Sequence, residues 1–168
     1  NVEQGHAAPK ALAAFERATV LATETGATER LVLTLWNVKS SYDVRAEYAQ
    51  ALALEKRLLA IAEKSGKDRW HVIAHMSLGF TQLRMGQLID AQRHLECGIQ
   101  RYDPARHANL AEHHGPDPGV ACLGWAAHAN WLLGHSTQAE QYCIDSLALA
   151  EAIGQQYGIA YARFMNMV

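Results

Sequence analysis

The feature that most constrains how this 168-residue chain can fold is a repeated spacing between small residues. Three glycines each follow a run of helix-forming residues, and an alanine stands 15 positions before each one: Ala11 and Gly26, Ala51 and Gly66, Ala139 and Gly154. A glycine caps a helix end without steric cost, and a small residue lets two helices approach closely. Because Gly26 and Gly66 lie 40 residues apart, the pattern predicts helical hairpins repeated with a period of about 40.

This register predicts a single helical-repeat domain over residues 1–168. The approximate repeats are residues 1–26, 27–66, 67–103, 119–154 and 155–168, with an insertion at 104–118. The period predicts a helix-ending glycine near residue 106, but none stands there. Instead Asp103-Pro104 ends one helix, and the insertion that follows closes in a proline- and glycine-rich turn. The first repeat holds only a second helix and the last only a first helix, so we expect a fragment of a longer chain.

Apolar residues at spacings of three and four predict where the helices lie. The expected pairs are residues 28–42 with 46–64, 68–84 with 86–102, and 120–133 with 137–153; a short extra helix is expected in 104–114. Hairpins stacked side by side bury a continuous apolar seam. The predicted fold is therefore all-α, a right-handed α-solenoid of antiparallel helix pairs.

Composition excludes several classes of partner. Apolar residues make up 49% of the chain, enough for a core, and the net charge of −2 gives no electrostatic footprint for nucleic acid or an anionic membrane. No run approaches the roughly 18 apolar residues of a membrane span. Three widely spaced cysteines in apolar runs, Cys97, Cys122 and Cys143, indicate reduced thiols. We expect a cytoplasmic protein that binds neither nucleic acid nor membrane.

The hairpin of residues 67–103 resembles a tetratricopeptide repeat. Residues on the expected slots of that pattern are Leu78-Gly79, Gly86, Ala91 and Leu95, and in the preceding hairpin Tyr42 and Ala51. His75 stands where the pattern has Trp, the terminal Pro is absent, and the period is nearer 40 than the roughly 34 of the consensus. The chain thus resembles a long-helix tetratricopeptide array, with repeats of the HEAT type as the structural alternative.

A narrower resemblance, which covers most of the chain, rests on residues 102–140. This segment is similar to one in the C-terminal repeat regions of large bacterial signalling proteins, and the matching residues are Tyr102-Asp103-Pro104, Arg106-His107, Asp117-Pro118-Gly119 and Trp131-Leu132-Leu133-Gly134. In that family a class III adenylate/guanylate cyclase or another output domain precedes an AAA-type ATPase module and then helical repeats. The resemblance implies a sensor or scaffold region. Neither enzymatic activity is carried over, because no residues match a Walker loop or a cyclase carboxylate pair.

The first helix of each tetratricopeptide pair lines a concave surface. In this register the residues expected on that surface are Trp36, Met76, Phe80, His128 and Trp131. An exposed aromatic stripe there would suit a peptide or another apolar segment. The alternative is that a short, tightly wound array buries these side chains against one another.

Histidines and acids give weaker signals. His71 and His75 stand four apart on one helix, a spacing that can bind a metal, but no third ligand lies nearby in the sequence. The insertion holds another group that could bind a metal or an anion: His107, Glu112, His113, His114 and Asp117. The alternative is a solvated loop in which the aspartate caps the next helix. Arg101 and Arg106 are expected to cap helices or pair with acids. We predict no metal, no cofactor and no catalytic residue.

The predicted function is a protein-interaction and regulatory scaffold that binds a peptide, or a neighbouring domain of the same chain, on its concave face. A small-molecule sensor with a pocket at the aromatic surface is the alternative. An enzyme would need perturbed titratable groups in a cleft, for which only His71, His75 and His128 are candidates. A homodimer through apolar end faces also stays open.

Overall fold

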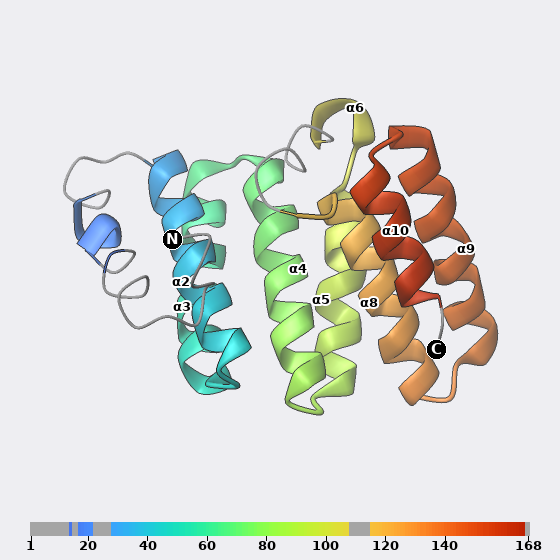
Figure 1. Cartoon of the computed structure of the whole chain (residues 1–168). Helices are drawn as coiled ribbons and strands as arrows, with labels where there is room; N and C mark the ends of the chain where they lie inside the picture. The colour runs from blue at the N-terminus through green and yellow to red at the C-terminus, as the bar shows by residue number, and fades with distance from the viewer. Residues whose placement is uncertain (1–13, 15–16, 22–27, 108–114, 167–168) are drawn as a thin grey trace. The chain divides into compact units, whose positions relative to one another are not determined.

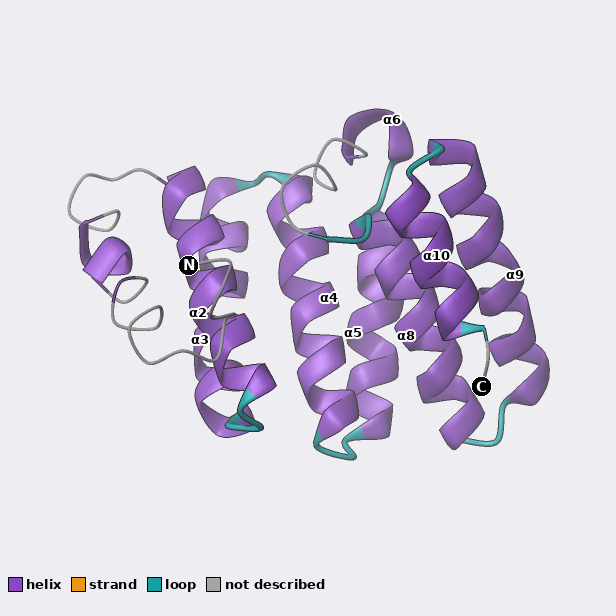
Figure 2. Ribbon diagram, in the orientation of Figure 1, coloured by secondary structure: helices purple, strands orange, loops and turns teal. Residues whose placement is uncertain are grey.

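The computed structural model describes residue 14 and residues 17–21, 28–107 and 115–166. These residues form helices joined by short connections, and no strand occurs among them (Figures 1 and 2), so the all-α prediction is confirmed. The helices are α2 (Thr28–Val44), α3 (Tyr48–Ser65), α4 (Asp68–Arg84), α5 (Leu88–Arg101), α6 (Pro104–His107), α8 (Pro118–Leu132), α9 (Ser136–Ile153) and α10 (Gln156–Met165). Within the described ranges every helix is too short or too polar to cross a bilayer.

The chain divides into two compact units, Asn1–Gly66 and Lys67–Val168. Helices α2 and α3 belong to the first unit and α4 to α10 to the second. The boundary falls at Gly66, where the sequence pattern ends one repeat. Helix α4 has the predicted bounds, and the other paired helices begin and end within two residues of theirs. Of the predicted extra helix, Pro104–His107 is helical and residues 108–114 lie outside the described residues.

The three hairpin turns share one backbone geometry. A residue with left-handed backbone stands in each turn: Ala46 (φ 58°), Gly86 (φ 74°) and Gly134 (φ 84°). The next residue donates its N–H to the carbonyl five positions earlier at 2.9 Å in every case, in the pairs Glu47–Tyr42, Gln87–Gln82 and His135–Asn130. This bond closes a Schellman-type helix end, a conformation that costs glycine little and alanine more. The turns therefore define which residues are equivalent in the three hairpins.

The predicted glycine stops are confirmed at two second helices. Gly66 (φ 62°) ends α3 and Gly154 (φ 75°) ends α9, and each donates its N–H at 3.1 Å to a helix carbonyl. Helix α5 ends differently, at Tyr102 with extended backbone, just before Asp103-Pro104. Gly26, the remaining predicted stop, lies outside the described residues, as do Ala11 and most of the first predicted repeat.

In the second unit, α4 and α5 cross at Gly79. A Cβ atom on Gly79 would stand 2.4 Å from Cγ of Leu95 and 3.2 Å from the carbonyl oxygen of Ala91. Leu95 and Ala91 are fully buried, which confirms that a small residue lies where the helices approach. The other face of Leu95 packs on Ala126 and Ala129 of α8, so the core continues from one hairpin to the next.

Helices α4, α8 and α10 are the first helices of successive hairpins, and they contact one another in that order, α4 with α8 and α8 with α10 (Figure 1). Helix α5 packs on α4 and α8, and α9 packs on α8 and α10. A cluster of Val120, Ala150 and Ala162 joins α8, α9 and α10. The second unit thus has one row of first helices and one of second helices.

The first unit contains a buried ion pair at its hairpin crossing. The Nζ of Lys39 on α2 lies 2.7 Å from Oδ2 of Asp43 and 3.3 Å from Oε1 of Glu55 on α3. The side chains of Lys39 and Glu55 are only 5% and 0% exposed. Glu55 falls on the apolar stripe that the periodicity predicts for α3, but it is a buried charge that needs Lys39 as its partner.

Helix α8 begins at the end of the insertion, where Asp117 is its N-terminal cap. The Asp117 carboxylate accepts the N–H groups of Gly119 (2.8 Å) and Val120 (3.3 Å), so the predicted aspartate cap is confirmed. Tyr102 packs so closely that a Cβ on Gly119 would stand 2.6 Å from its ring. Its hydroxyl faces the Asp117 carboxylate. These contacts tie the end of α5 to the start of α8.

The other polar residues of the insertion serve structure as well. His107 is buried, and its Nδ1 accepts the N–H of Asp103 at 3.0 Å. Arg101 and Arg106 both reach Asp68 at the start of α4, at 3.4 and 3.6 Å, as predicted for arginines paired with an acid. Glu112, His113 and His114 lie outside the described residues.

Candidate binding site on the second unit

Trp125 is at the centre of an aromatic row along the first helices. Its ring meets Phe80 of α4 edge-on, with centroids 4.8 Å apart, and lies 5.6 Å from the ring of His128. Its indole N–H lies near the hydroxyl of Tyr161 on α10. We call Phe80, Trp125 and His128 the aromatic row. All three side chains are half-buried, so each presents part of its surface to solvent.

Sequence reasoning selected Phe80 and His128 but missed Trp125. The signal was present, because Trp125 precedes His128 by three residues and Trp131 by six on one helix. Trp131 is 55% exposed, as the open-surface hypothesis requires. Trp36 belongs to the first unit, where it is half-buried with Lys39 Nζ 5.0 Å from its ring centroid.

Met76, by contrast, is only 7% exposed and does not line an open surface. Helix α4 is packed by both α5 and α8, and most of its side chains are buried. At this level α5 approaches through Gly98, whose added Cβ would stand 3.8 Å from the backbone nitrogen of Met76. The prediction for Met76 is therefore wrong, since the helical register alone did not show that α5 lies so close.

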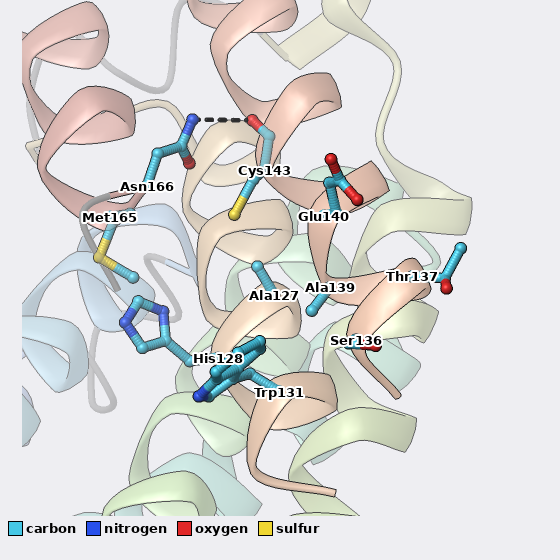
Figure 3. Close-up of a pocket in the computed structure, with 10 residues that line it drawn as sticks. All are labelled: Ala127, His128, Trp131, Ser136, Thr137, Ala139, Glu140, Cys143, Met165 and Asn166. Atoms are coloured by element: carbon cyan, nitrogen blue, oxygen red, sulfur yellow. Dashed lines mark hydrogen bonds between the residues drawn. The ribbon is translucent and has the colours of Figure 1, made fainter. Parts of the chain in front are cut away.

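Beside His128 and Trp131 the surface is hollowed between α8, α9 and the end of α10 (Figure 3). The hollow has a volume of about 360 Å³. It is lined by Ala127, His128, Trp131, Ser136, Thr137, Ala139, Glu140, Cys143, Met165 and Asn166. Two predicted site residues, His128 and Trp131, thus meet at a cavity that the sequence did not reveal.

The hollow lies where one residue of the α8/α9 hairpin is smaller than its equivalent in the α4/α5 hairpin. Counted from the hairpin turns, Ala127 and Cys143 are equivalent to Gly79 and Leu95 of the α4/α5 hairpin. Leu95 is fully buried and fills the space at its crossing. A cysteine at the same position fills less of it. Protein interiors leave few such spaces, so an open one beside exposed aromatic rings is a candidate ligand site.

Hydrogen bonds fix the roles of two polar groups in the hollow. His128 Nδ1 lies 3.0 Å from the Gly124 carbonyl, which can only accept, so this nitrogen carries the proton and the neutral ring keeps Nε2 as an acceptor. The amide nitrogen of Asn166 donates to the Cys143 carbonyl at 3.1 Å (Figure 3). Its Oδ1 is buried and accepts no hydrogen bond from the described residues.

The thiol of Cys143 is not poised for chemistry. Burial and then the nearby carboxylate of Glu140 raise its pKa, which keeps it protonated near neutral pH. A neutral thiol is a weak nucleophile and a poor metal ligand. Although Cys143 and His128 line the same hollow, their arrangement suits the binding of a ligand better than the making of a covalent bond.

The remaining candidates, His71 and His75, lie elsewhere on α4. His75 Nδ1 is 2.9 Å from Nδ1 of His94 on α5, and the His71 ring is stacked 6.4 Å from that of His75. Burial and the neighbouring His94 lower the pKa of His75 to about 4, and burial also lowers the pKa of His94. At least one of the two bonded rings must be neutral to accept the hydrogen bond.

Among the described residues, no three His, Cys, Asp or Glu side chains gather in a way that could hold a metal ion. The geometry of the second unit instead brings an aromatic row, an exposed tryptophan and an acceptor-lined hollow onto neighbouring helices. The chain matches no protein-family model, and a search of curated proteins finds no match either.

Proposed function

We propose that this chain is a protein-interaction module that binds a peptide, or a neighbouring domain, across α4, α8 and α10 of its second unit. The observation that carries the proposal is Trp131, 55% exposed beside the half-buried aromatic row and a hollow of about 360 Å³. Tryptophan is enriched at interface hot spots, where its large apolar surface is removed from water on binding.

The repeated hairpin turns support a tetratricopeptide-like α-solenoid as the scaffold of this surface. In such arrays the first helices form the recognition face, which here would be that of α4, α8 and α10. Together with the similarity of residues 102–140 to bacterial signalling proteins, this favours a regulatory scaffold within a larger cytoplasmic protein. In this proposal the segment itself carries out no catalysis.

The proposal is tested by selecting peptides from a displayed library and measuring their affinity for defined variants. Trp131→Ala should weaken binding by about tenfold or more, the loss typical of an interface hot spot. The matched control is Ile89→Ala, which shortens another exposed apolar side chain, 74% exposed on α5. Equal affinities for wild type and Trp131→Ala, or equal losses in both variants, would contradict the proposal. Trp36→Ala tests whether the first unit contributes to binding.

A small-molecule sensor is the second candidate, favoured by the hollow itself. Its volume of about 360 Å³ lies within the range of roughly 300–1,000 Å³ that is usual for small-molecule sites. A thermal-shift screen with a panel of metabolites distinguishes the two functions. A compound that raises the melting temperature of wild type but not of Trp131→Ala, when no selected peptide binds, would favour the sensor.

A further inference from the structure

We infer that the hollow between α8, α9 and the end of α10 receives the guanidinium group of an arginine side chain on the partner peptide. The inference rests on the proposed peptide-binding function and names the chemistry that the site recognises. Three observations carry it: the charge of the hollow, the hydrogen-bond acceptors in its wall and the aromatic ring at its mouth.

The charge of the hollow is negative. Glu140 is the one formally charged residue in its lining, which holds neither lysine nor arginine. With the described residues Glu140 forms no ion pair, although acids elsewhere on the chain, such as Glu55 and Asp68, are paired. A carboxylate left without a counter-charge beside an open cavity attracts a cationic group.

Two polar groups of the wall, His128 and Asn166, keep only acceptors, while the Ser136 and Thr137 hydroxyls can donate or accept. His128 presents Nε2 as an acceptor because its Nδ1 proton is held by the Gly124 carbonyl. The amide nitrogen of Asn166 donates to the Cys143 carbonyl, and its Oδ1 accepts no hydrogen bond from the described residues. A guanidinium carries five N–H donors and no acceptor, so it complements this set.

Trp131 supplies the apolar contact that distinguishes a guanidinium from a compact ammonium. Its exposed ring lines the hollow together with the buried Met165. A guanidinium is planar and weakly hydrated, and it stacks on aromatic faces while forming hydrogen bonds at its edge. A carboxylate, an indole face and neutral acceptors around one cavity are therefore suited to arginine.

The opposite assignment would place an anion at the first turn of α9, where Ser136 and Thr137 line the hollow. Free N–H groups at a helix start attract negative charge. The carboxylate of Glu140 on the next turn of the same helix opposes this, because any anion in the hollow would lie beside it without a cation in the lining.

The test uses the full chain and two probes that differ in charge, N-acetyl-arginine amide and N-acetyl-citrulline amide, followed by NMR. Arginine amide should shift the indole signal of Trp131 and the backbone signal of Glu140, whereas the neutral isostere should not. Glu140→Gln should weaken arginine binding by about tenfold, the effect of losing a charge-assisted hydrogen bond. Glu151→Gln removes the same charge from the same helix outside the hollow and should leave binding unchanged.

Equal binding of arginine and citrulline, stronger binding of N-acetyl-aspartate amide, or equal losses in Glu140→Gln and Glu151→Gln would each overturn the inference. Selected peptides separate its failure from that of the proposed function. If they bind through Trp131 but replacing each arginine by citrulline changes nothing, the inference fails and the interaction module stands. If arginine amide binds in the hollow but no peptide does, the guanidinium site stands and the peptide-binding function fails.

Discussion

The α2/α3 hairpin of the first unit and the α4/α5 hairpin of the second have the same turn but fill their crossings with opposite chemistry. Counted from the turn, Lys39 is equivalent to Gly79 and Glu55 to Leu95. The first hairpin buries an ion pair, whereas the second packs a leucine against a glycine. The turn and the helix lengths therefore set where two helices meet, while the two facing side chains decide what holds them together.

The α8/α9 hairpin extends the comparison to a third case. Its equivalent residues, Ala127 and Cys143, provide neither a long charged pair nor a leucine to fill the gap, and the hollow lies between them. Variation at one pair of equivalent positions thus gives a buried salt bridge, a dry apolar contact and a candidate binding site.

The largest effect is expected at the ion pair. Lys39→Met should destabilise the first unit by about 3–5 kcal/mol, because it removes the ammonium group that lies 3.3 Å from the buried Glu55 carboxylate. Urea unfolding, with hydrogen exchange of α2 and α3 to locate the change, measures this. Lys56→Met, an exposed lysine on α3, is the control and should change stability little. A Lys39→Met protein as stable as the control would show that the pair contributes nothing.

The same comparison predicts a rescue. Replacing Lys39, Asp43 and Glu55 together by Gly, Leu and Leu gives the first hairpin the residues of the second at equivalent positions, Gly79, Leu83 and Leu95. Exchanging a buried ionic cluster for a packed apolar one is often neutral or stabilising. The triple variant should therefore be more stable to urea than Lys39→Met. If it is less stable, the crossings of the two hairpins are not interchangeable.

At the apolar crossing, Gly79→Ala should destabilise the second unit by up to about 2 kcal/mol. The new Cβ would stand 2.4 Å from Leu95 Cγ, and overpacking of about 1–3 kcal/mol outweighs the roughly 1 kcal/mol gained in helix propensity. A double-mutant cycle with Leu95→Ala checks the cause. Because truncation removes the clash, Gly79→Ala should cost less in that background; additive effects would place the strain elsewhere.

Acid should act on the second unit through His75 and His94, whose equivalents in the first hairpin are Leu35 and Leu54. The pKa of His75 is lowered from 6.5 to about 4 on folding, so the unfolded chain binds the proton more readily. The contribution of neutral His75 to the folding stability is fully present above pH 6.5 and is lost as the pH falls toward 4.

With allowance for the partial exposure of the ring, the loss is on the order of 1 kcal/mol. Hydrogen exchange of α4 and α5 at pH 7 and pH 4.5 should show it, and His75→Leu should reduce it. The same acid sensitivity in wild type and His75→Leu would contradict the assignment.

The smallest effect on stability is expected at the hollow, because the open space beside Ala127 has room for a longer side chain. Cys143→Leu copies Leu95 at the equivalent position. Because the longer side chain occupies the cavity, the variant should no longer bind arginine amide or selected peptides, as NMR titration would detect. Cys97→Leu, on α5 outside the hollow, is the control. Unchanged binding by Cys143→Leu would mean that the ligand does not enter the hollow.

The positions of the helices could be predicted because they depend on residues close together in the chain. Glycine stops at Gly66 and Gly154, and apolar residues at steps of three and four, were enough to place the pairs. The site was predicted less well. His128 and Trp131 were found from the helical register, but Met76 was wrong and Trp125 was missed, because exposure depends on which helix packs against each face.

The sequence by itself determined the hairpins and their spacing, since caps, turns and amphipathic stripes are read within a few residues. Tertiary structure alone decided that Glu55 would meet Lys39, that His75 would bond to His94 and that a hollow would open beside Trp131. These features depend on the volume and charge of side chains that different helices bring to one place. A repeat period fixes where the helices meet, but it does not fix which side chains fill the space between them.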